Sequence, residues 1–136
     1  MTYLLDTNAC IGWLRGNQPN LVARLQTERP ANLHLCSVVV AELRYGVERS
    51  DPAHRANTAL RVEQLRGQFV SLPFDDAAAE EYGRIRALLA TQGNSIGGND
   101  LMIAAITMAN GQTLVTHNTA EFSRVPGLLL EDWELP

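Results

Sequence analysis

The sequence contains no lysine, and this absence excludes a group of mechanisms. All 11 basic residues are arginine and 15 residues are acidic, so the formal net charge is −4. Mechanisms that require a catalytic lysine are therefore impossible for this chain. The acidic balance also weighs against broad nucleic-acid binding through a basic surface.

Cysteines and long apolar runs are scarce as well. Cys10 and Cys36 have neither a CxxC nor a metal-type spacing, and we expect both to be reduced and at least half-buried. The 3 histidines are scattered and suggest no zinc site. No apolar stretch reaches the roughly 18 residues that a membrane span requires, and the N-terminus lacks the basic segment of a signal peptide. We expect a cytoplasmic protein without a membrane segment.

The residues that are present predict one compact domain over positions 1–136. Hydrophobic residues make up 46% and charged residues 19%, as in ordinary globular proteins. Short apolar runs predict strands at 3–5, 33–36, 69–72 and 113–115, with a short fifth at 128–130. Helical stretches separate them: one ending near 15, then 20–28, 37–49, 52–66, 75–91 and 100–110. Strands that alternate with helices in this way predict a parallel sheet covered on both faces.

Ligands of such folds bind at the carboxyl ends of the strands. In the stretch YLLDTN, Asp6 closes the first predicted strand, and His117 and Asn118 follow the fourth. A buried strand should not end on an unpaired carboxylate. We therefore expect the functional site at this edge of the sheet.

Most of the acidic residues have an ordinary surface explanation. Some have an arginine one helical turn away, some begin a helix, and others lie in loops or near the C-terminus. This group comprises Glu48 (with Arg44), Glu63 (with Arg66), Glu80 (with Arg84), Asp75, Asp76, Glu28, Asp51, Glu131, Asp132 and Glu134.

Four acids fit this explanation poorly, although each retains an alternative. Asp6 ends a buried strand, or it caps the next helix. Glu42 lies in the apolar stripe of SVVVAELRYGV, or it pairs with a buried arginine. Asp100 starts the apolar helix DLMIAAITMA, or it is simply the N-cap. Glu121 lies just beyond the fourth strand, or it is a solvated turn residue.

A parallel sheet would bring these four acids to one edge. Converging carboxylates without lysine repel one another, so that some would have to stay protonated. A hard divalent cation such as Mg²⁺ or Mn²⁺ removes this conflict, because it prefers oxygen ligands and keeps bound water. Such a site suits hydrolysis of a phosphodiester. Phosphoryl transfer to an aspartate, as in receiver domains or haloacid-dehalogenase-type phosphatases, also uses a lysine, which this chain lacks.

Four stretches in order resemble the sequential motifs of PIN domains, and they are most similar to the VapC toxins of toxin–antitoxin pairs. These stretches are YLLDTN, SVVVAELRYG, GGNDLMIAA and LVTHNTAEFSRVPGL, and the resemblance extends from Met1 to about Trp133. It implies a three-layer α/β/α fold with a central parallel sheet of four to five strands. It also implies an endoribonuclease site that depends on Mg²⁺ or Mn²⁺.

The resemblance assigns roles residue by residue. The family's first acid corresponds to Asp6, its helix glutamate to Glu42 and its third acid to Asp100. Many members carry an aspartate where this chain has Asn118, so Glu121 is expected to supply the fourth charge. Asp6, Asp100 and Glu121 would hold metal, and Glu42 would bind a second ion or accept a proton. Thr7, Asn8, Thr116 and Asn118 are expected as supporting hydrogen-bond donors.

Partners also follow from the resemblance. It implies an RNA substrate, either transfer or ribosomal RNA, whose phosphates would meet Arg15 and Arg44. It implies a homodimer that a VapB-type antitoxin inhibits as a hetero-oligomer. The alternative is a catalytically silent PIN-fold interaction module, which would be expected to lack one of the acids.

Overall fold

The computed structural model describes residues 1–136 and contains one sheet of five parallel strands. The strand order is β3-β2-β1-β4-β5. The strands are β1 (Tyr3–Leu5), β2 (Leu33–Cys36), β3 (Val70–Leu72), β4 (Thr113–Val115) and β5 (Leu129–Glu131). The predicted α/β fold with a parallel sheet is confirmed.

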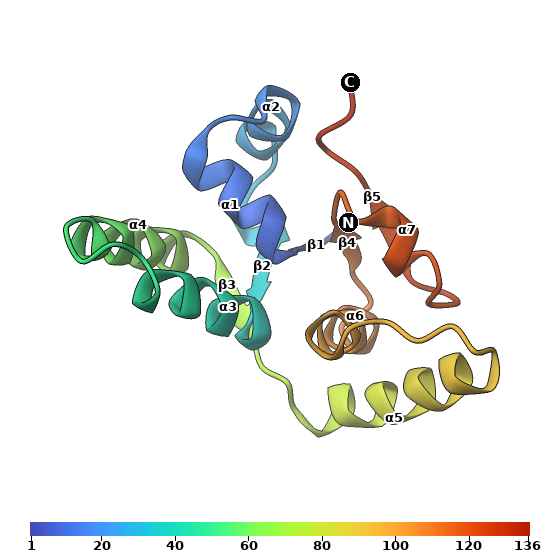
Figure 1. Ribbon diagram of the computed structural model, residues 1–136. Helices are drawn as coiled ribbons and strands as arrows, with labels where there is room; N and C mark the ends of the chain where they lie inside the picture. The colour runs from blue at the N-terminus through green and yellow to red at the C-terminus, as the bar shows by residue number, and fades with distance from the viewer.

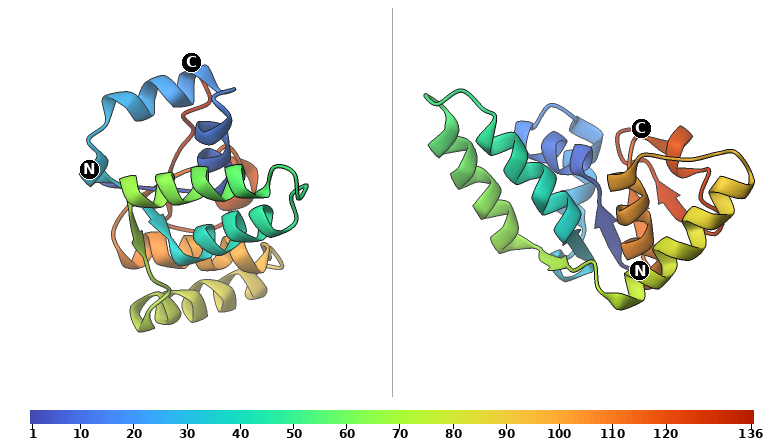
Figure 2. Two further views of the ribbon diagram at one scale, coloured as in Figure 1. Left: turned by 90° about the vertical axis from the view of Figure 1, so that its left-hand side faces the viewer. Right: turned by 60° about the horizontal axis from the view of Figure 1, so that its bottom comes forward.

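Helices cover both faces of this sheet (Figure 1). The helices α1 and α2 lie on one side and α5 and α6 on the other, while α3 and α4 form a pair beside the β3 edge, as Figure 2 also shows. Their bounds are α1 (Thr7–Arg15), α2 (Pro19–Thr27), α3 (Ser37–Glu48), α4 (Arg55–Gln68), α5 (Asp76–Thr91), α6 (Gly98–Ala109) and α7 (Thr119–Phe122), with a short 3₁₀ turn η1 (Pro30–Asn32). None of these helices has both the length and the apolar character needed to cross a membrane.

The central strands are buried along their whole length, which explains why their sequences do not alternate between apolar and polar residues. Leu4, Leu5 and Leu114 have no exposed surface. A strand covered by helices on both faces needs apolar side chains on both. The apolar character of α6 has the same cause, because it packs between the sheet and α5.

The register aligns the carboxyl ends of β1 and β4. Leu5 lies opposite Val115, and the Asp6 amide donates to the Val115 carbonyl at 3.1 Å. The next residues along each strand, Asp6 and Thr116, therefore emerge side by side. This alignment places the polar residues after the two central strands at one edge of the sheet.

Several predicted boundaries and one predicted ion pair are wrong in detail. Ser37 has the residue type expected of an N-cap, yet Cys36 occupies that position of α3, and the Ser37 hydroxyl accepts the Phe74 amide at 3.1 Å. The helix predicted from position 52 begins at Arg55. Arg84 pairs with Glu81 at 2.6 Å and not with Glu80. The predicted pairs of Glu63 with Arg66 and of Glu48 with Arg44 are confirmed at 3.1 and 3.2 Å.

Candidate active site

Asp6 is buried at the junction of β1 and α1. Its carboxylate caps α1 by accepting the Ala9 amide at 2.8 Å, so the capping alternative is correct but incomplete. Burial raises the pKa of Asp6 to about 6, although hydrogen bonds from Thr116 and Ala9 oppose this rise. The negative charges of Glu134 and Glu42 raise that pKa further. The capped carboxylate therefore lies within a group of acids.

Glu42 faces this group from α3. The Thr7 hydroxyl donates to Glu42 Oε1 at 2.6 Å, which joins the first turn of α1 to α3. No arginine forms an ion pair with Glu42, so the alternative of a buried arginine partner is wrong. The charge of Glu42 raises the pKa of both Asp6 and Asp100, and all three carboxylates thus lie within electrostatic reach of one another.

Asp100 lies in the first turn of α6, two residues inside the helix. Gly97 occupies the N-cap position, so the N-cap alternative for Asp100 is wrong. Burial raises the pKa of Asp100 to about 7, and the charge and hydrogen bond of Glu121 add to the effect. Of this pair, Asp100 is therefore the acid that takes up a proton more readily.

Glu121 is held in place and is not a solvated turn residue. Its Oε1 accepts the Gly97 amide and its Oε2 accepts the Asn118 side-chain amide, both at 2.8 Å. These two bonds lower the pKa of Glu121. Asn118 and Glu121 thus act as one unit, in which the amide orients the carboxylate.

The four acids come from four separate elements, and apart from the contact between Asp100 and Glu121 the groups that hold them are uncharged. None of them forms an ion pair with an arginine or a histidine. Burial, with repulsion between the acids, raises the pKa of Asp6 to about 6 and that of Asp100 to about 7. A cluster of carboxylate oxygens whose charge is not compensated has the chemistry that a hard divalent cation requires. The residues present therefore fit such an ion.

A groove leads away from this cluster between α1, α3 and α4. It has a volume of about 780 Å³. Thr7, Asn8, Glu42 and Asn99 line its end at the acids. The rest of its lining includes apolar side chains of α1, α3 and α4 together with Tyr45, Arg15, Arg49 and Arg61.

The two arginines proposed from the sequence lie in different surroundings. Arg15 lines the groove and forms no ion pair. Arg44 does not line the groove and instead pairs with Glu48 at 3.2 Å and with Glu63 at 3.8 Å. Arg49 and Arg61, which the sequence did not single out, share the unpaired state and the groove position of Arg15.

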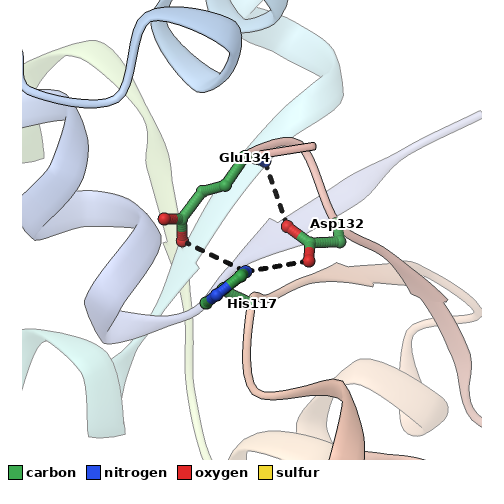
Figure 3. A group of neighbouring side chains, drawn as sticks. All are labelled: His117, Asp132 and Glu134. Atoms are coloured by element: carbon green, nitrogen blue, oxygen red, sulfur yellow. Dashed lines mark hydrogen bonds and ion pairs between the residues drawn. The ribbon is translucent and has the colours of Figure 1, made fainter. Parts of the chain in front are cut away.

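Sequence reasoning also missed a group next to Asp6. His117 Nδ1 lies 2.9 Å from Asp132 Oδ2 and 3.9 Å from Glu134 Oε2 (Figure 3). From the sequence, both acids have an ordinary surface explanation. Their place in the chain is the signal that could have found them. Asp132 and Glu134 come within three residues of the end of β5, and His117 comes two residues after β4, so all three emerge at the same edge of the sheet.

The fold and the acidic edge of the sheet together define the class of protein to which the chain belongs. A family model described as PIN domain matches residues 3–128, and the chain belongs to this family.

Within the family, the chain is similar over nearly its whole length to VapC ribonucleases. It is 40% identical over 133 residues to the tRNA(fMet)-specific endonuclease VapC of Shigella flexneri, covering 98% of each chain. It is 35% identical over 135 residues to ribonuclease VapC2 of Rickettsia felis, covering 98% of this chain and 99% of the relative. A crystal structure of VapBC2 from Rickettsia felis, bound to a promoter DNA fragment, contains a chain that superposes with a TM-score of 0.90 at 33% identity, covering 98% and 99%.

These relatives confirm the resemblance to VapC-type toxin ribonucleases. The alternative of a silent interaction module is not favoured, because all four acids are present and the relatives are ribonucleases by name.

Proposed function

We propose that this chain, acting as one domain over residues 1–136, cuts structured RNA by hydrolysing a phosphodiester bond. The products are a 5′-phosphate and a 3′-hydroxyl. Transfer RNA is the first substrate class to test, since the Shigella flexneri relative is named for one, and ribosomal RNA is the second. The observation that carries the proposal is the convergence of Asp6, Glu42, Asp100 and Glu121 without an ion pair to any basic side chain.

Asp6, Asp100 and Glu121 would hold the divalent cation, for which we propose Mg²⁺ or Mn²⁺. When bound, such an ion lowers the pKa of a coordinated water and offsets charge on the phosphate. The protein's part is to present the oxygens in fixed directions. Asp6 is held by Ala9 and Thr116, and Glu121 is held by Gly97 and Asn118.

Glu42 has a separate role in the proposal. The 2.6 Å bond from Thr7 occupies Oε1 and leaves Oε2 for a second partner. We propose that this oxygen either accepts the proton of the attacking water or binds a second ion. Asn8 and Asn99 flank Glu42 where the groove meets the acids, and they supply amide groups for the substrate at that point.

The groove suits a single RNA strand. Arg15, Arg49 and Arg61 have no carboxylate partner, so their guanidinium groups are free to bind phosphates. Tyr45 is 66% exposed, and the Arg49 guanidinium lies 5.4 Å from its ring centroid. An unpaired base can stack on the free face of such a ring. This arrangement gives an acidic protein a local path for RNA.

The proposed partners follow the complexes of the relatives. Structures of relatives include VapBC assemblies from Rickettsia felis and Salmonella typhimurium. We propose that a VapB-type antitoxin likewise binds and inhibits this chain, and that the toxin itself is a homodimer. Light scattering of the purified toxin alone, and of the toxin coexpressed with a candidate VapB-type antitoxin, tests both statements.

The central experiment is cleavage of purified transfer RNA by the isolated toxin. Mn²⁺ should support cleavage, excess EDTA should stop it, and mapping of new 5′ ends should locate the bond. Asp6→Asn is the inactive control. Calorimetric titration with Mn²⁺ supplies a second readout. No saturable heat together with no cleavage of transfer or ribosomal RNA would contradict the proposal and revive the silent-module alternative.

A further inference from the structure

His117 has one ring nitrogen held and the other free. Its Nδ1 lies 2.9 Å from Asp132 Oδ2, and a protonated Nδ1 that donates to this carboxylate leaves Nε2 as the reactive position. In Figure 3 the second ring nitrogen is turned away from both Asp132 and Glu134. The side chain is 58% exposed, so Nε2 is accessible to a bound substrate.

The two acids beside the imidazole are themselves held in place by hydrogen bonds and packing. The Glu134 amide donates to Asp132 Oδ1 at 3.0 Å, and the Asn20 side chain donates to the Glu134 carbonyl at 3.1 Å. Trp133, between the two acids, packs edge-on against Tyr3 with ring centroids 4.9 Å apart. The segment that carries both acids is thus anchored to β1 and α2, and it holds His117 in one orientation.

His117 also lies beside the residues of the proposed reaction. Its neighbour Thr116 bonds to Asp6, and its neighbour Asn118 bonds to Glu121. The charge of Asp6 acts directly on the imidazole. A histidine at this point borders the acidic cluster from the segment after β4, and it does not line the groove that Glu42 borders from α3.

We propose that His117 is the general acid of the cleavage reaction, donating the Nε2 proton to the leaving 3′ oxygen. In this step a water oxygen bonds to phosphorus while the bond between phosphorus and the 3′ oxygen breaks. The electron pair of that bond goes to the 3′ oxygen, which takes the Nε2 proton and becomes the 3′-hydroxyl. The water loses its proton to Glu42 or to solvent, and solvent reprotonates the imidazole.

The groups that face His117 favour its protonated form. The hydrogen bond that His117 donates to Asp132 raises the pKa of His117, and the charges of Glu134, Asp132 and Asp6 act in the same direction, against the effect of burial. The imidazole therefore keeps its proton to a higher pH than a free histidine does, and it loses that proton as the pH rises further. Efficient general acids have a pKa close to the working pH.

This proposal rests on the proposed function, the hydrolysis of RNA. The test compares two leaving groups. The probe is a synthetic oligoribonucleotide spanning the bond that the wild type cuts in transfer RNA. A second version carries sulfur in place of the bridging 3′ oxygen, because a thiolate leaves without a proton. His117→Gln should cut the oxygen version roughly 100-fold more slowly or worse, and it should cut the sulfur version at nearly the wild-type rate. His54→Gln, an exposed histidine outside the site, should match the wild type on both.

The pH profile gives a second readout. The wild-type rate on the oxygen substrate should fall on the alkaline side, and His117→Gln should lack this fall. Asp132→Asn should move it to lower pH, because the carboxylate that raises the pKa is gone. Equal rates for His117→Gln and wild type on the oxygen substrate would overturn the proposal, and so would equal losses on both substrates. An inactive wild type would instead contradict the proposed function itself.

Discussion

Replacing Asp6 with asparagine should abolish cleavage and at the same time make the free protein more stable. Asp6 is only 4% exposed, and burial raises its pKa from 3.8 to about 6. An acid whose pKa is higher in the folded than in the unfolded state weakens folding once it ionises. The penalty is absent well below pH 3.8, grows between pH 4 and 6, and is complete above that range.

The magnitude follows from the two pKa values. Each tenfold difference in proton affinity is worth about 1.4 kcal/mol, so ionised Asp6 costs about 3 kcal/mol at pH 7 and less than about 1 kcal/mol at pH 4. Asparagine removes this cost and remains a good N-cap, because its carbonyl oxygen accepts the Ala9 amide. Its extra amide protons need acceptors, which offsets part of the gain. We expect a rise in Tm of roughly 5–10 °C at pH 7.

Thermal unfolding by circular dichroism in EDTA, from pH 4 to pH 8, measures this effect. Asp75→Asn is the matched control, since Asp75 also caps a helix by accepting the Ala78 amide, at 3.0 Å, but lies outside the acidic cluster. The control should show no gain that grows with pH. An Asp6→Asn variant with the same pH dependence as wild type would refute the electrostatic reasoning. Mn²⁺ should raise the Tm of wild type and not that of Asp6→Asn.

Three further predictions concern the other site residues. Glu42→Gln should slow single-turnover cleavage at least about 100-fold without lowering the Tm by more than a few degrees, and a large drop in Tm would instead mark Glu42 as a structural residue. Glu121→Gln should raise the Mn²⁺ concentration for half-maximal cleavage by about 10–100-fold; an unchanged titration would mean that three acids suffice. Arg61→Gln should weaken RNA binding and reduce its salt dependence by about one phosphate contact. Arg66→Gln, which removes an arginine paired with Glu63 at 3.1 Å, should leave binding unchanged.

The sheet was predictable because its strands are buried on both faces. Short apolar runs without alternation predict parallel strands, and β1, β2 and β4 have the predicted bounds. Helix starts were less predictable, because they depend on tertiary contacts. Ser37 has the residue type of an N-cap, yet its hydroxyl bonds to Phe74. That contact spans 37 residues and leaves no local pattern.

The core of the candidate site was predictable for a similar reason. Asp6, Glu42 and Asp100 each border or interrupt an apolar stretch, Glu121 follows the fourth strand, and a parallel sheet gathers all four at one edge. The role of the segment after β5 was not predictable in this way. Asp132 and Glu134 lie near the C-terminus of this sequence, where an acid usually has no partner, and only the folded chain shows His117 beside them.

The partners of the acids explain why the site retains its negative charge. Thr7, Thr116, Asn118 and the amides of Ala9 and Gly97 hold the carboxylates without neutralising them. An arginine at any of these positions would orient an acid equally well and would cancel its charge. Because the site uses neutral donors, the charge is left for protons or for a cation. The protons compete with the cation, so metal affinity should weaken as the pH falls through about 7 and 6, where Asp100 and Asp6 take up protons.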